Sequence, residues 1–240
     1  MGASIAFLLL TKNEEHAIAS ALRGLRHICE TQGWENVGFF LADDSHDATR
    51  IIAEREGATI IAGDGKGLGS AYRAGLEEVL RHAPDLIVTL DGDGQTELSE
   101  IPRFIAIQRS TRADLVLGSR FQNKDLVQYT YRKRNRLGTW LLSHYLTWMT
   151  GQKITDSHGG IRVITPRAAQ GIKIYGAHTY VQESIVDIHE RGMRIVEIPS
   201  VWKKREQGQS RVVHSIGKYI LRVAPFLALR AMLRLRPRWN

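Results

Sequence analysis

The sequence contains a single cysteine, Cys29, among its 240 residues, and this scarcity is the first limit on what the protein can be. One cysteine cannot form an intrachain disulfide, so a disulfide-linked scaffold is excluded and we expect a reducing compartment. No cysteine and histidine spacing typical of a zinc site occurs. The apolar fraction of 43% and the charged fraction of 24% are those of a globular protein, and the length suits one large α/β domain.

Long hydrophobic runs are missing as well. The first apolar run, residues 3–10, has no basic segment before it and is followed by the polar residues 11–15. It is too short for a transmembrane helix and has the wrong flanks for a signal peptide, so we interpret it as a buried strand. Internal repeats and low-complexity linkers are absent too.

Positive charge is abundant but unevenly placed. The formal net charge is +8, and residues 203–240 contain ten Lys or Arg against one acid, Glu206, which leaves the rest of the chain close to neutral. A near-neutral domain with a cationic tail suits an anionic membrane surface or a nucleic acid as partner.

Strand and helix signals alternate along the chain. β-rich runs occur at residues 4–10, 37–42, 59–62, 86–90 and 114–117, with helical stretches near 14–32, 46–57, 69–82 and 98–111. This rhythm predicts an α/β fold with a mostly parallel sheet and helices on both faces. Beyond Arg120 we expect a mobile loop at 121–136, a helix at 136–150, a strand at 160–164, a helix at 182–192 and a strand at 194–198.

The predicted strands all end in polar residues. In sheets of this kind ligands bind outside the carboxyl ends of the strands. Here those ends are residues 11–14, 43–47, 63–67, 91–93 and 118–120, and most of them carry acidic or glycine-rich sequence. Structural turns alone would not need so many reactive groups on one edge, so we expect the functional site there.

The most informative of these ends is Asp91-Gly92-Asp93. Two carboxylates at a strand terminus can meet one hard divalent cation, and Gly92 lets a bulky ligand approach the backbone. Mg²⁺ bound by one or two carboxylates usually completes its shell with substrate phosphates, which indicates a nucleotide-phosphate substrate. The alternative is a polar turn, because Asp-Gly is a common turn dipeptide.

Two further segments favour phosphate and nucleotide recognition. Residues 65–70, Gly-Lys-Gly-Leu-Gly-Ser, open a predicted helix whose amides could bind phosphate, although neither a P-loop nor a dinucleotide fingerprint is complete. Residues 43–49 place acids between a strand and a helix, where they could contact a base or ribose or simply cap the helix.

Taken together, the motifs resemble those of family 2 inverting glycosyltransferases with the GT-A fold, and among them polyprenyl-phosphate (dolichol-phosphate-type) mannosyl- and glucosyltransferases. The matching segments are residues 8–14, 43–49 (D-D-x-S-x-D-x-T), 66–72 (K-G-x-G-x-A-Y), 91–95 (D-x-D-x-Q), 118–120 (G-S-R), 156–162 (D-x-x-S-G-F-R) and 205–210 (R-x-x-G-x-S). Leu10 replaces the usual Pro, the Asp43 motif is one residue short, and Gly159 and Ile161 replace Ser and Phe.

The resemblance implies a nucleotide-diphosphate sugar donor, a GDP- or UDP-hexose, and Mg²⁺ or Mn²⁺. It implies metal binding at Asp91, Asp93 and Gln95. Donor binding is implied for Leu10, Thr11, Asn13, Glu14, Asp43, Asp44, Lys66, Asp91, Gly92 and Arg205, with either Asp43 or Asp44 as the base contact.

The acceptor implied by the resemblance is a polyprenyl or dolichyl phosphate. Such a phosphate is already ionised, so it needs placement more than deprotonation, and the guanidinium fork of arginine suits that task. The candidates are Arg120, Arg132, Arg136 and Arg205; Asp93, Arg120 and Arg136 are the predicted catalytic residues. The run around Arg132–Arg136 could instead be a solvated charge cluster.

Glu183 stands where relatives with alcohol acceptors often have an acidic base, and here it could instead order a loop. Trp34, Trp140 and Trp148 are predicted to pack in the core or at an interface. We divide the chain into a GT-A domain, 1–213, and a basic amphipathic tail, 214–240, whose helix within 216–235 could lie on a membrane or pack on the domain.

The predicted location is therefore peripheral, on the cytoplasmic side of a membrane. A saccharide or protein hydroxyl acceptor is the alternative. A nucleic-acid-binding module ranks last, because few aromatic residues accompany the tail charges and nucleic-acid binding would need them for stacking; we expect no nucleic acid partner.

Overall fold

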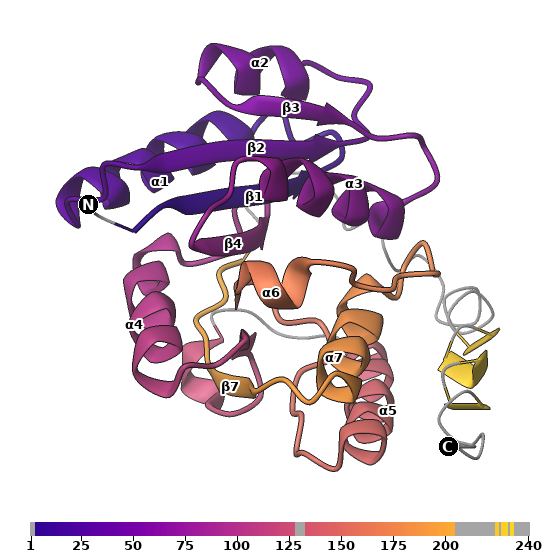
Figure 1. Ribbon diagram of the computed structural model, residues 1–240. Coiled ribbons are helices and arrows are strands. Elements are labelled where there is room, and N and C mark those ends of the chain that lie inside the picture. Colours follow the sequence, from indigo (N-terminus) through magenta and orange to yellow (C-terminus); the bar gives the residue numbers. More distant parts are fainter. Residues whose placement is uncertain (1–2, 128–132, 205–223, 226, 230, 233–240) are drawn as a thin grey trace.

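A computed structural model describes residues 3–127, 133–204, 224–225, 227–229 and 231–232 of the chain. Its centre is one seven-stranded sheet with the order β3-β2-β1-β4-β6-β5-β7 (Figure 1). The strands are β1 Ile5–Thr11, β2 Val37–Asp43, β3 Thr59–Ala62, β4 Leu86–Asp91, β5 Leu115–Ser119, β6 Arg162–Ile164 and β7 Ile195–Pro199. β6 runs antiparallel to both of its neighbours, β4 and β5, and every other pairing is parallel.

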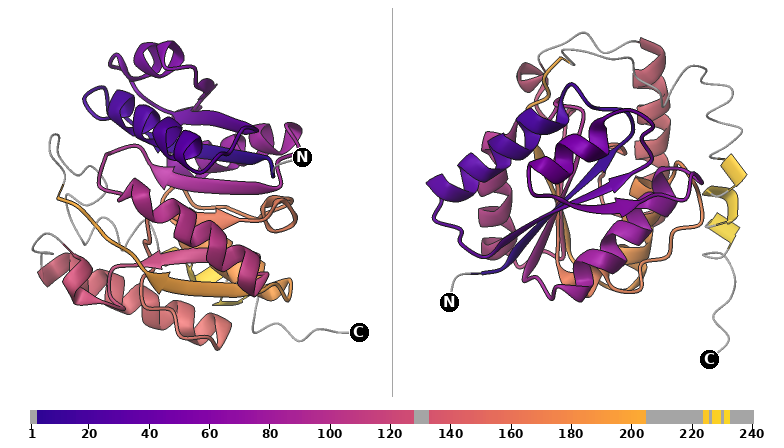
Figure 2. Two further views of the ribbon diagram at one scale, coloured as in Figure 1. Left: turned by 90° about the vertical axis from the view of Figure 1, so that its left-hand side faces the viewer. Right: turned by 90° about the horizontal axis from the view of Figure 1, so that it is seen from above.

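Helices cover both faces of the sheet (Figures 1 and 2). They are α1 Ile18–Thr31, α2 Thr49–Arg55, α3 Leu68–Arg81, α4 Ile101–Thr111, α5 Lys133–Thr150, α6 Pro166–Ala169 and α7 Tyr180–Glu190. One apolar cluster joins the sheet to α1, α2 and α4, and the other joins it to α3, α5, α6 and α7. The predicted α/β fold, with a mostly parallel sheet between two helical layers, is confirmed.

The central strand β1 shows why the sequence builds this architecture. All seven of its residues are buried. Because side chains alternate along a strand, Ala6, Leu8 and Leu10 enter one apolar cluster while Ile5, Phe7 and Leu9 enter the other. A strand covered on both faces needs a continuous apolar run, which is the pattern of residues 3–10 in the sequence.

The strands expected in the first half of the chain lie within two residues of the predicted positions, and the later ones are also present. The predicted loop at 121–136 is partly wrong. A short 3₁₀ helix occupies Lys124–Leu126 and α5 already begins at Lys133, so only part of this segment is irregular in the described chain.

The tryptophans, predicted to pack in the core or at an interface, divide between the core and the surface. Trp34 packs against the core as predicted. Trp140 and Trp148 do not belong to the core, because they are 53% and 52% exposed on α5. Leu137 and Leu141 are exposed on the same helix, at 59% and 50%. The spacing of these four residues places them along one side of α5, which therefore presents an apolar stripe to solvent.

Among the described helices, none is both long and apolar enough to cross a membrane. The described parts of the C-terminal segment lie beside α5 (Figure 1). There the Tyr145 hydroxyl donates a hydrogen bond to the Leu227 carbonyl oxygen at 2.9 Å, and Ala231 packs against a core cluster.

Candidate active site at the carboxyl edge of the sheet

The ends of β1, β2 and β4 meet at one edge of the sheet. Thr11 is in register with Asp43 of β2, and Leu10 is in register with Asp91 of β4. The Gly92 amide donates to the Leu10 carbonyl oxygen at 3.0 Å. Segments far apart in sequence, predicted separately to bind a donor, are thus brought side by side.

The turn after β1 is tied to the segment after β2. Asn13 has a left-handed backbone with φ of 54°, a conformation that Asn tolerates better than most residues. Its amide donates to the Ser45 hydroxyl at 2.6 Å, and its side-chain oxygen accepts from the His46 amide at 2.7 Å. The Glu14 amide donates to the Thr49 hydroxyl at 2.9 Å. These bonds fix the predicted donor-binding turn before any ligand arrives.

Asp43 and Asp44 occupy different environments. Asp43 is fully buried, and its carboxylate accepts from the Thr11 hydroxyl at 2.6 Å, the Ser45 amide at 2.9 Å and Arg50 Nε at 2.7 Å. Through these hydrogen bonds Asp43 joins the end of β1 to the segment that follows β2. Asp44 instead accepts from the Gly65 amide at 3.1 Å and so lies against the glycine-rich loop.

The backbone of the glycine-rich loop, residues 65–70, lies very close to the backbone of Gly176 and Ala177. Gly67 has φ of 106°, and a Cβ on Gly69 would lie 2.1 Å from the Gly176 carbonyl oxygen. The Gly69 amide donates to the Ala177 carbonyl oxygen at 2.9 Å, immediately after α3 begins. Only glycine fits at these points, so the loop depends on its neighbour, residues 175–179, for its conformation.

Glu183 of α7 holds that neighbouring loop. Its buried carboxylate accepts from the Tyr175 amide at 2.7 Å, the Gly176 amide at 2.9 Å and the Thr179 hydroxyl. Within the described structure this carboxylate orders a loop, which is the alternative to a general base that the sequence left open.

Lys66 is exposed at the tip of the glycine-rich loop. Its ammonium group lies 3.1 Å from Asp64. Hydrogen bonds from the Lys66 amide and the Ser70 hydroxyl lower the pKa of Asp64 to about 2, so Asp64 stays ionised beside the lysine. A phosphate ligand would compete with this carboxylate for Lys66.

The Asp-x-Asp motif lies at the tip of β4. A Cβ on Gly92 would lie 2.3 Å from Thr11 Cγ2, so Gly92 is the residue that lets the motif pack on β1. Asp93 accepts from the Gln95 amide at 3.1 Å. The Gln95 side-chain amide donates to the Lys203 carbonyl oxygen at 3.2 Å, and the Lys203 amide donates to the Gln95 carbonyl oxygen at 2.9 Å.

The metal-binding capacity of this motif follows from its donor set. In the described part of the chain, no group of three or more His, Cys, Asp or Glu side chains is arranged to hold an ion. Two carboxylates and an amide oxygen fit a hard cation that keeps waters and takes its remaining ligands from substrate phosphate. The residues thus fit Mg²⁺ or Mn²⁺ bound together with a donor.

The Gly-Ser-Arg segment ends in a buried ion pair. Arg120 is 5% exposed, and the Asp156 carboxylate accepts from its Nε at 2.7 Å and from its Nη2 at 2.8 Å. The guanidinium carbon also lies 4.5 Å from the ring centroid of Trp202. Burial would raise the pKa of Asp156, but the charge and hydrogen bonds of Arg120 lower it below its usual value. As placed, Arg120 joins three segments of the chain, and Asp156 engages the Nε and Nη2 edge of its guanidinium group.

The other residues predicted to bind the acceptor phosphate are Arg132, Arg136 and Arg205. Arg136 is exposed on the first turn of α5. Arg132 and Arg205 lie outside the described residues. Their predicted roles stay predictions.

Three residues that help to build the site were not predicted from the sequence to do so. Glu197 accepts from the Thr155 and Asp156 amides at 2.9 Å each and so orders the loop that carries Asp156. Trp202 pairs through its backbone with Thr96 and Val127. Arg162, part of a recognised motif, is fully buried near Asp91. Nothing in the local sequence signals these contacts, because each joins segments distant in the chain.

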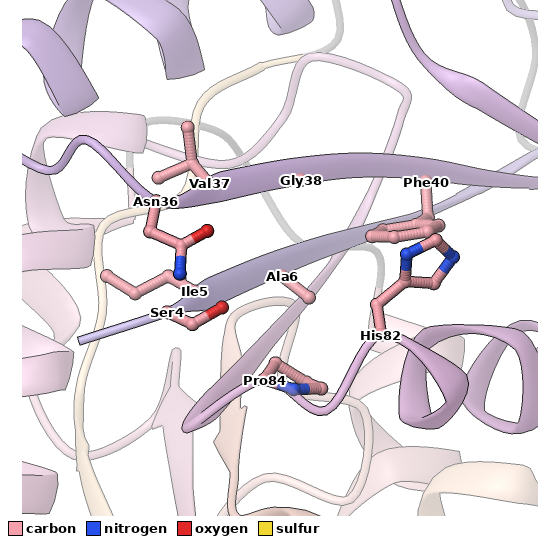
Figure 3. Close-up of a pocket in the computed structure, with 9 residues that line it drawn as sticks. All are labelled: Ser4, Ile5, Ala6, Asn36, Val37, Gly38, Phe40, His82 and Pro84. Atoms are coloured by element: carbon pink, nitrogen blue, oxygen red, sulfur yellow. The ribbon is translucent and has the colours of Figure 1, made fainter.

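A hollow of about 180 Å³ lies at the other edge of the sheet, by the amino ends of β1 and β2 (Figure 3). It is lined by Ser4, Ile5, Ala6, Asn36, Val37, Gly38, Phe40, His82 and Pro84. Pockets for cofactors and substrates usually measure roughly 300–1,000 Å³. Its size and position both argue against a role in the chemistry.

An α/β sheet with helices on both faces and an Asp-x-Asp motif at the carboxyl end of β4 defines a GT-A-type glycosyltransferase. Residues 7–170 match the glycosyl transferase family 2 profile, and the chain belongs to that family.

Its relatives include the low-salt glycan biosynthesis hexosyltransferase Agl6 of Haloferax volcanii, 29% identical over 85% of this chain and 48% of that protein. The chain thus spans about half of that relative. A dolichyl-phosphate hexose transferase of the same organism is 27% identical over 91% of this chain and 93% of its own length.

The fold is also that of a glucosyl-3-phosphoglycerate synthase from Mycobacterium tuberculosis, solved with Mn²⁺, UDP-glucose and glycerol 3-phosphate. The TM-score is 0.70 at 18% identity, covering 95% of this chain and 80% of the other.

Proposed function

We propose that this glycosyltransferase moves a hexose from a nucleotide-diphosphate sugar to a polyprenyl or dolichyl phosphate, with inversion at the anomeric carbon. The observation that carries the donor half is the Asp91-Gly92-Asp93 tip of β4 beside the ends of β1 and β2. A phosphate oxygen of the acceptor attacks the anomeric carbon, the bond to the donor diphosphate breaks, and the nucleoside diphosphate leaves.

The donor is held by groups with separate tasks. Asp44 and the Thr11–Glu14 turn bind the base and ribose, and Asp43 holds the two strand ends in place. Lys66 and the amides of the glycine-rich loop face the diphosphate. Asp91, Asp93 and Gln95 would hold Mg²⁺ or Mn²⁺, which neutralises charge on the leaving diphosphate.

The choice of a phosphate acceptor is supported by the chemistry of the second half of the site. An ionised phosphate needs no general base, and Glu183, the carboxylate expected for one, is occupied by two backbone amides and a hydroxyl. Arg136, together with Arg132 and Arg205, is proposed to bind the acceptor phosphate. The name of the dolichyl-phosphate hexose transferase relative supports the same acceptor class.

A membrane surface is the proposed place of reaction. The apolar stripe of α5, Leu137, Trp140, Leu141 and Trp148, is exposed and begins next to Arg136. Exposed tryptophan and leucine beside basic residues suit the boundary between headgroups and acyl chains. The cationic tail adds attraction to anionic lipid, so the protein is proposed to act peripherally, on the cytoplasmic face.

A panel assay tests the proposal: the protein, Mg²⁺ or Mn²⁺, GDP- and UDP-hexoses, and either a short polyprenyl phosphate or free saccharides as acceptor. Lipid-linked sugar is the expected product, and Glu183→Gln should lower its formation only a few-fold. Transfer to a saccharide hydroxyl, abolished by Glu183→Gln, would establish the hydroxyl-acceptor alternative instead. A glutamine keeps the size but cannot act as a base, which makes it a matched replacement.

A further inference from the structure

Arg162, the first residue of β6, is among the largest side chains that are fully buried, with 1% exposure. Its guanidinium carbon lies 4.9 Å from the ring centroids of both Tyr72 and Tyr180. Tyr72 comes from α3 and Tyr180 from α7, and the two ring centroids are 4.9 Å apart. The cation is thus enclosed by aromatic rings from both helices.

This buried cation has few polar partners. Its Nε and Nη1 atoms have no hydrogen-bond partner among the described residues, and no carboxylate of the described chain lies within 4.0 Å of it. Buried arginines are normally paired with carboxylates, since an unpaired charge inside a protein is costly. Stability alone therefore does not explain a charge at this position.

The register of the sheet relates Arg162 to Asp91. Arg162 is opposite Thr89 of β4. Directly opposite residues point to the same face, and Asp91 follows Thr89 by two positions, so Arg162 and Asp91 share that face. Burial alone would lower the pKa of Arg162, but the electrostatic influence of Tyr72, Tyr180 and Asp91 and a hydrogen bond with the Tyr180 side chain raise it. Burial and, after it, the negative charge of Asp91 raise the pKa of Tyr180. The Asp91 carboxylate therefore acts on the same group of side chains that encloses Arg162.

We propose that Arg162 is a positioning residue for donor binding, because its buried positive charge offsets that of Asp91 behind the donor site. The inference rests on the proposed nucleotide-sugar donor. With Arg162 in place, the edge of the sheet presents less net negative charge to the incoming diphosphate.

If Arg162 offsets the charge of Asp91, removing its charge should change the affinities for cations and for anions in opposite directions. Arg162→Met keeps much of the volume and apolar contact but removes the charge. The variant should bind Mn²⁺ alone about tenfold more tightly and a nucleotide sugar without metal about tenfold more weakly. Its melting temperature should equal or exceed that of the wild type, since an apolar group of similar size replaces a buried charge whose Nε and Nη1 atoms have no hydrogen-bond partner among the described residues.

The experiment compares the wild type with Arg162→Met, Arg162→Lys and the control Arg26→Met. Arg26 also lies over an aromatic ring, Phe39, but belongs to α1, away from β4. Mn²⁺ binding is followed by electron paramagnetic resonance, and metal-free binding of UDP-glucose and GDP-mannose by calorimetry. Arg162→Lys retains the charge and should stay within about threefold of the wild type in both affinities; Arg26→Met should change neither.

Specific results would overturn the inference. Affinities for Mn²⁺ and nucleotide sugar that fall together in Arg162→Met, or a marked loss of melting temperature, would assign Arg162 a structural role. Affinities of Arg162→Lys that depart from the wild type by much more than about threefold would show that ring packing rather than charge matters. This result can be read even if Arg162→Met prevents folding. A wild type that binds neither Mn²⁺ nor a nucleotide sugar would contradict the proposed function itself.

Discussion

The proposed donor and acceptor sides of the site differ in how their side chains are held. On the donor side, short strand ends are joined by hydrogen bonds between neighbours, as in the Thr11–Asp43 and Asn13–Ser45 pairs. On the acceptor side, Arg120 and Asp156 form a buried ion pair across segments distant in sequence, while Arg136 is exposed on a helix.

The difference teaches how each side achieves binding. A donor with a charged diphosphate and a planar base can be met by a preformed edge whose groups are already oriented. The proposed acceptor phosphate belongs to a lipid that stays in a bilayer, so the protein must bring its arginines to the membrane. A donor half held by hydrogen bonds between strand ends and an acceptor half with Arg136 at the surface fit these two demands.

The largest effect should come from the donor side. Asp93→Ala should reduce turnover at least about a hundredfold, because Asp93 is a proposed ligand for the cation that would neutralise the leaving diphosphate. The fold should survive, since Asp93 is partly exposed. The measurement is kcat with Mn²⁺ titrated, and circular dichroism checks folding.

Asp85→Ala is the matched control for that prediction. Asp85 is an exposed carboxylate at the opposite edge, where it accepts from the Ser4 amide at 2.7 Å. Its loss should leave turnover within about twofold of the wild type. Full activity of Asp93→Ala in the presence of a chelator would contradict the proposed role of the metal.

The acceptor side should respond through KM. Arg136→Ala should raise KM for polyprenyl phosphate about tenfold while nucleotide binding stays unchanged, because we propose that this guanidinium contacts only the acceptor. Arg136→Lys should restore little, since an ammonium group lacks the fork. Arg109→Ala on α4, also an exposed arginine, serves as control. Equal losses in donor and acceptor binding would erase the distinction between the two sides.

The two aspartates after β2 can be separated in the same way. Asp44→Asn should raise KM for the donor about tenfold with little change in stability, because we assign Asp44 to the base or ribose. Asp43→Asn should lower the free energy of unfolding by about 1–3 kcal/mol, since Asp43 is buried with Thr11, Ser45 and Arg50 as partners. Urea unfolding and donor KM are measured for both; swapped phenotypes would reverse the assignment.

Membrane contact gives a smaller, salt-dependent effect. The full chain should co-sediment with anionic liposomes and be partly released by high salt, because charge attraction acts over about 8–10 Å near physiological ionic strength. Truncation after His214 and Leu137→Ser should each weaken binding several-fold. Ile51→Ser, at an exposed apolar residue of α2, should not. Normal transfer to bilayer-embedded lipid by the truncated protein, without liposome binding, would remove the tail from the mechanism.

The smallest effect concerns pH and the acceptor-side ion pair. Burial, reinforced by Arg120, lowers the pKa of His158 to about 4. An unfolded histidine titrates near pH 6.5, so the unfolded state takes up a proton first as the pH falls. Stability contributed by neutral His158 should therefore be complete above about pH 6.5 and decline as the pH falls from 6.5 to 4.

The measurement is the melting temperature from pH 7 to 4. His158→Asn removes the titrating group, so its melting temperature should fall less over this range than that of the wild type. Parallel curves for the two proteins would show that His158 is protonated in the folded state as readily as in the unfolded one.

Much of this arrangement could be predicted from the sequence. The continuous apolar run of β1 and the alternation of strands and helices indicated a sheet covered on both faces, because a strand in the middle of such a sheet has no solvent-facing side. The polar strand ends indicated the functional edge, since parallel strands bring their carboxyl ends together. The sequence also left open whether Asp43 or Asp44 contacts the base, and the structure adds that their hydrogen-bond partners differ.

Expectations failed or stopped short where a contact joins distant segments. The sequence left open whether Trp140 and Trp148 pack in the core or at an interface, because apolar residues occur on buried and on exposed faces of helices; the structure places both at the surface. The Gly-Ser-Arg motif marked Arg120 but not the carboxylate that occupies its fork.

The sequence by itself determined the class of fold and the chemistry at the strand ends, since both depend on periodicity and on residues adjacent in the chain. Only the tertiary structure decided which charges meet. Arg120 faces Asp156 from 36 positions away, and Arg162 reaches the rings of Tyr72 and Tyr180 through the packing of α3 and α7. The energy of a charge depends on its surroundings in space, and burial and distance are set by the packed chain rather than by neighbours in sequence.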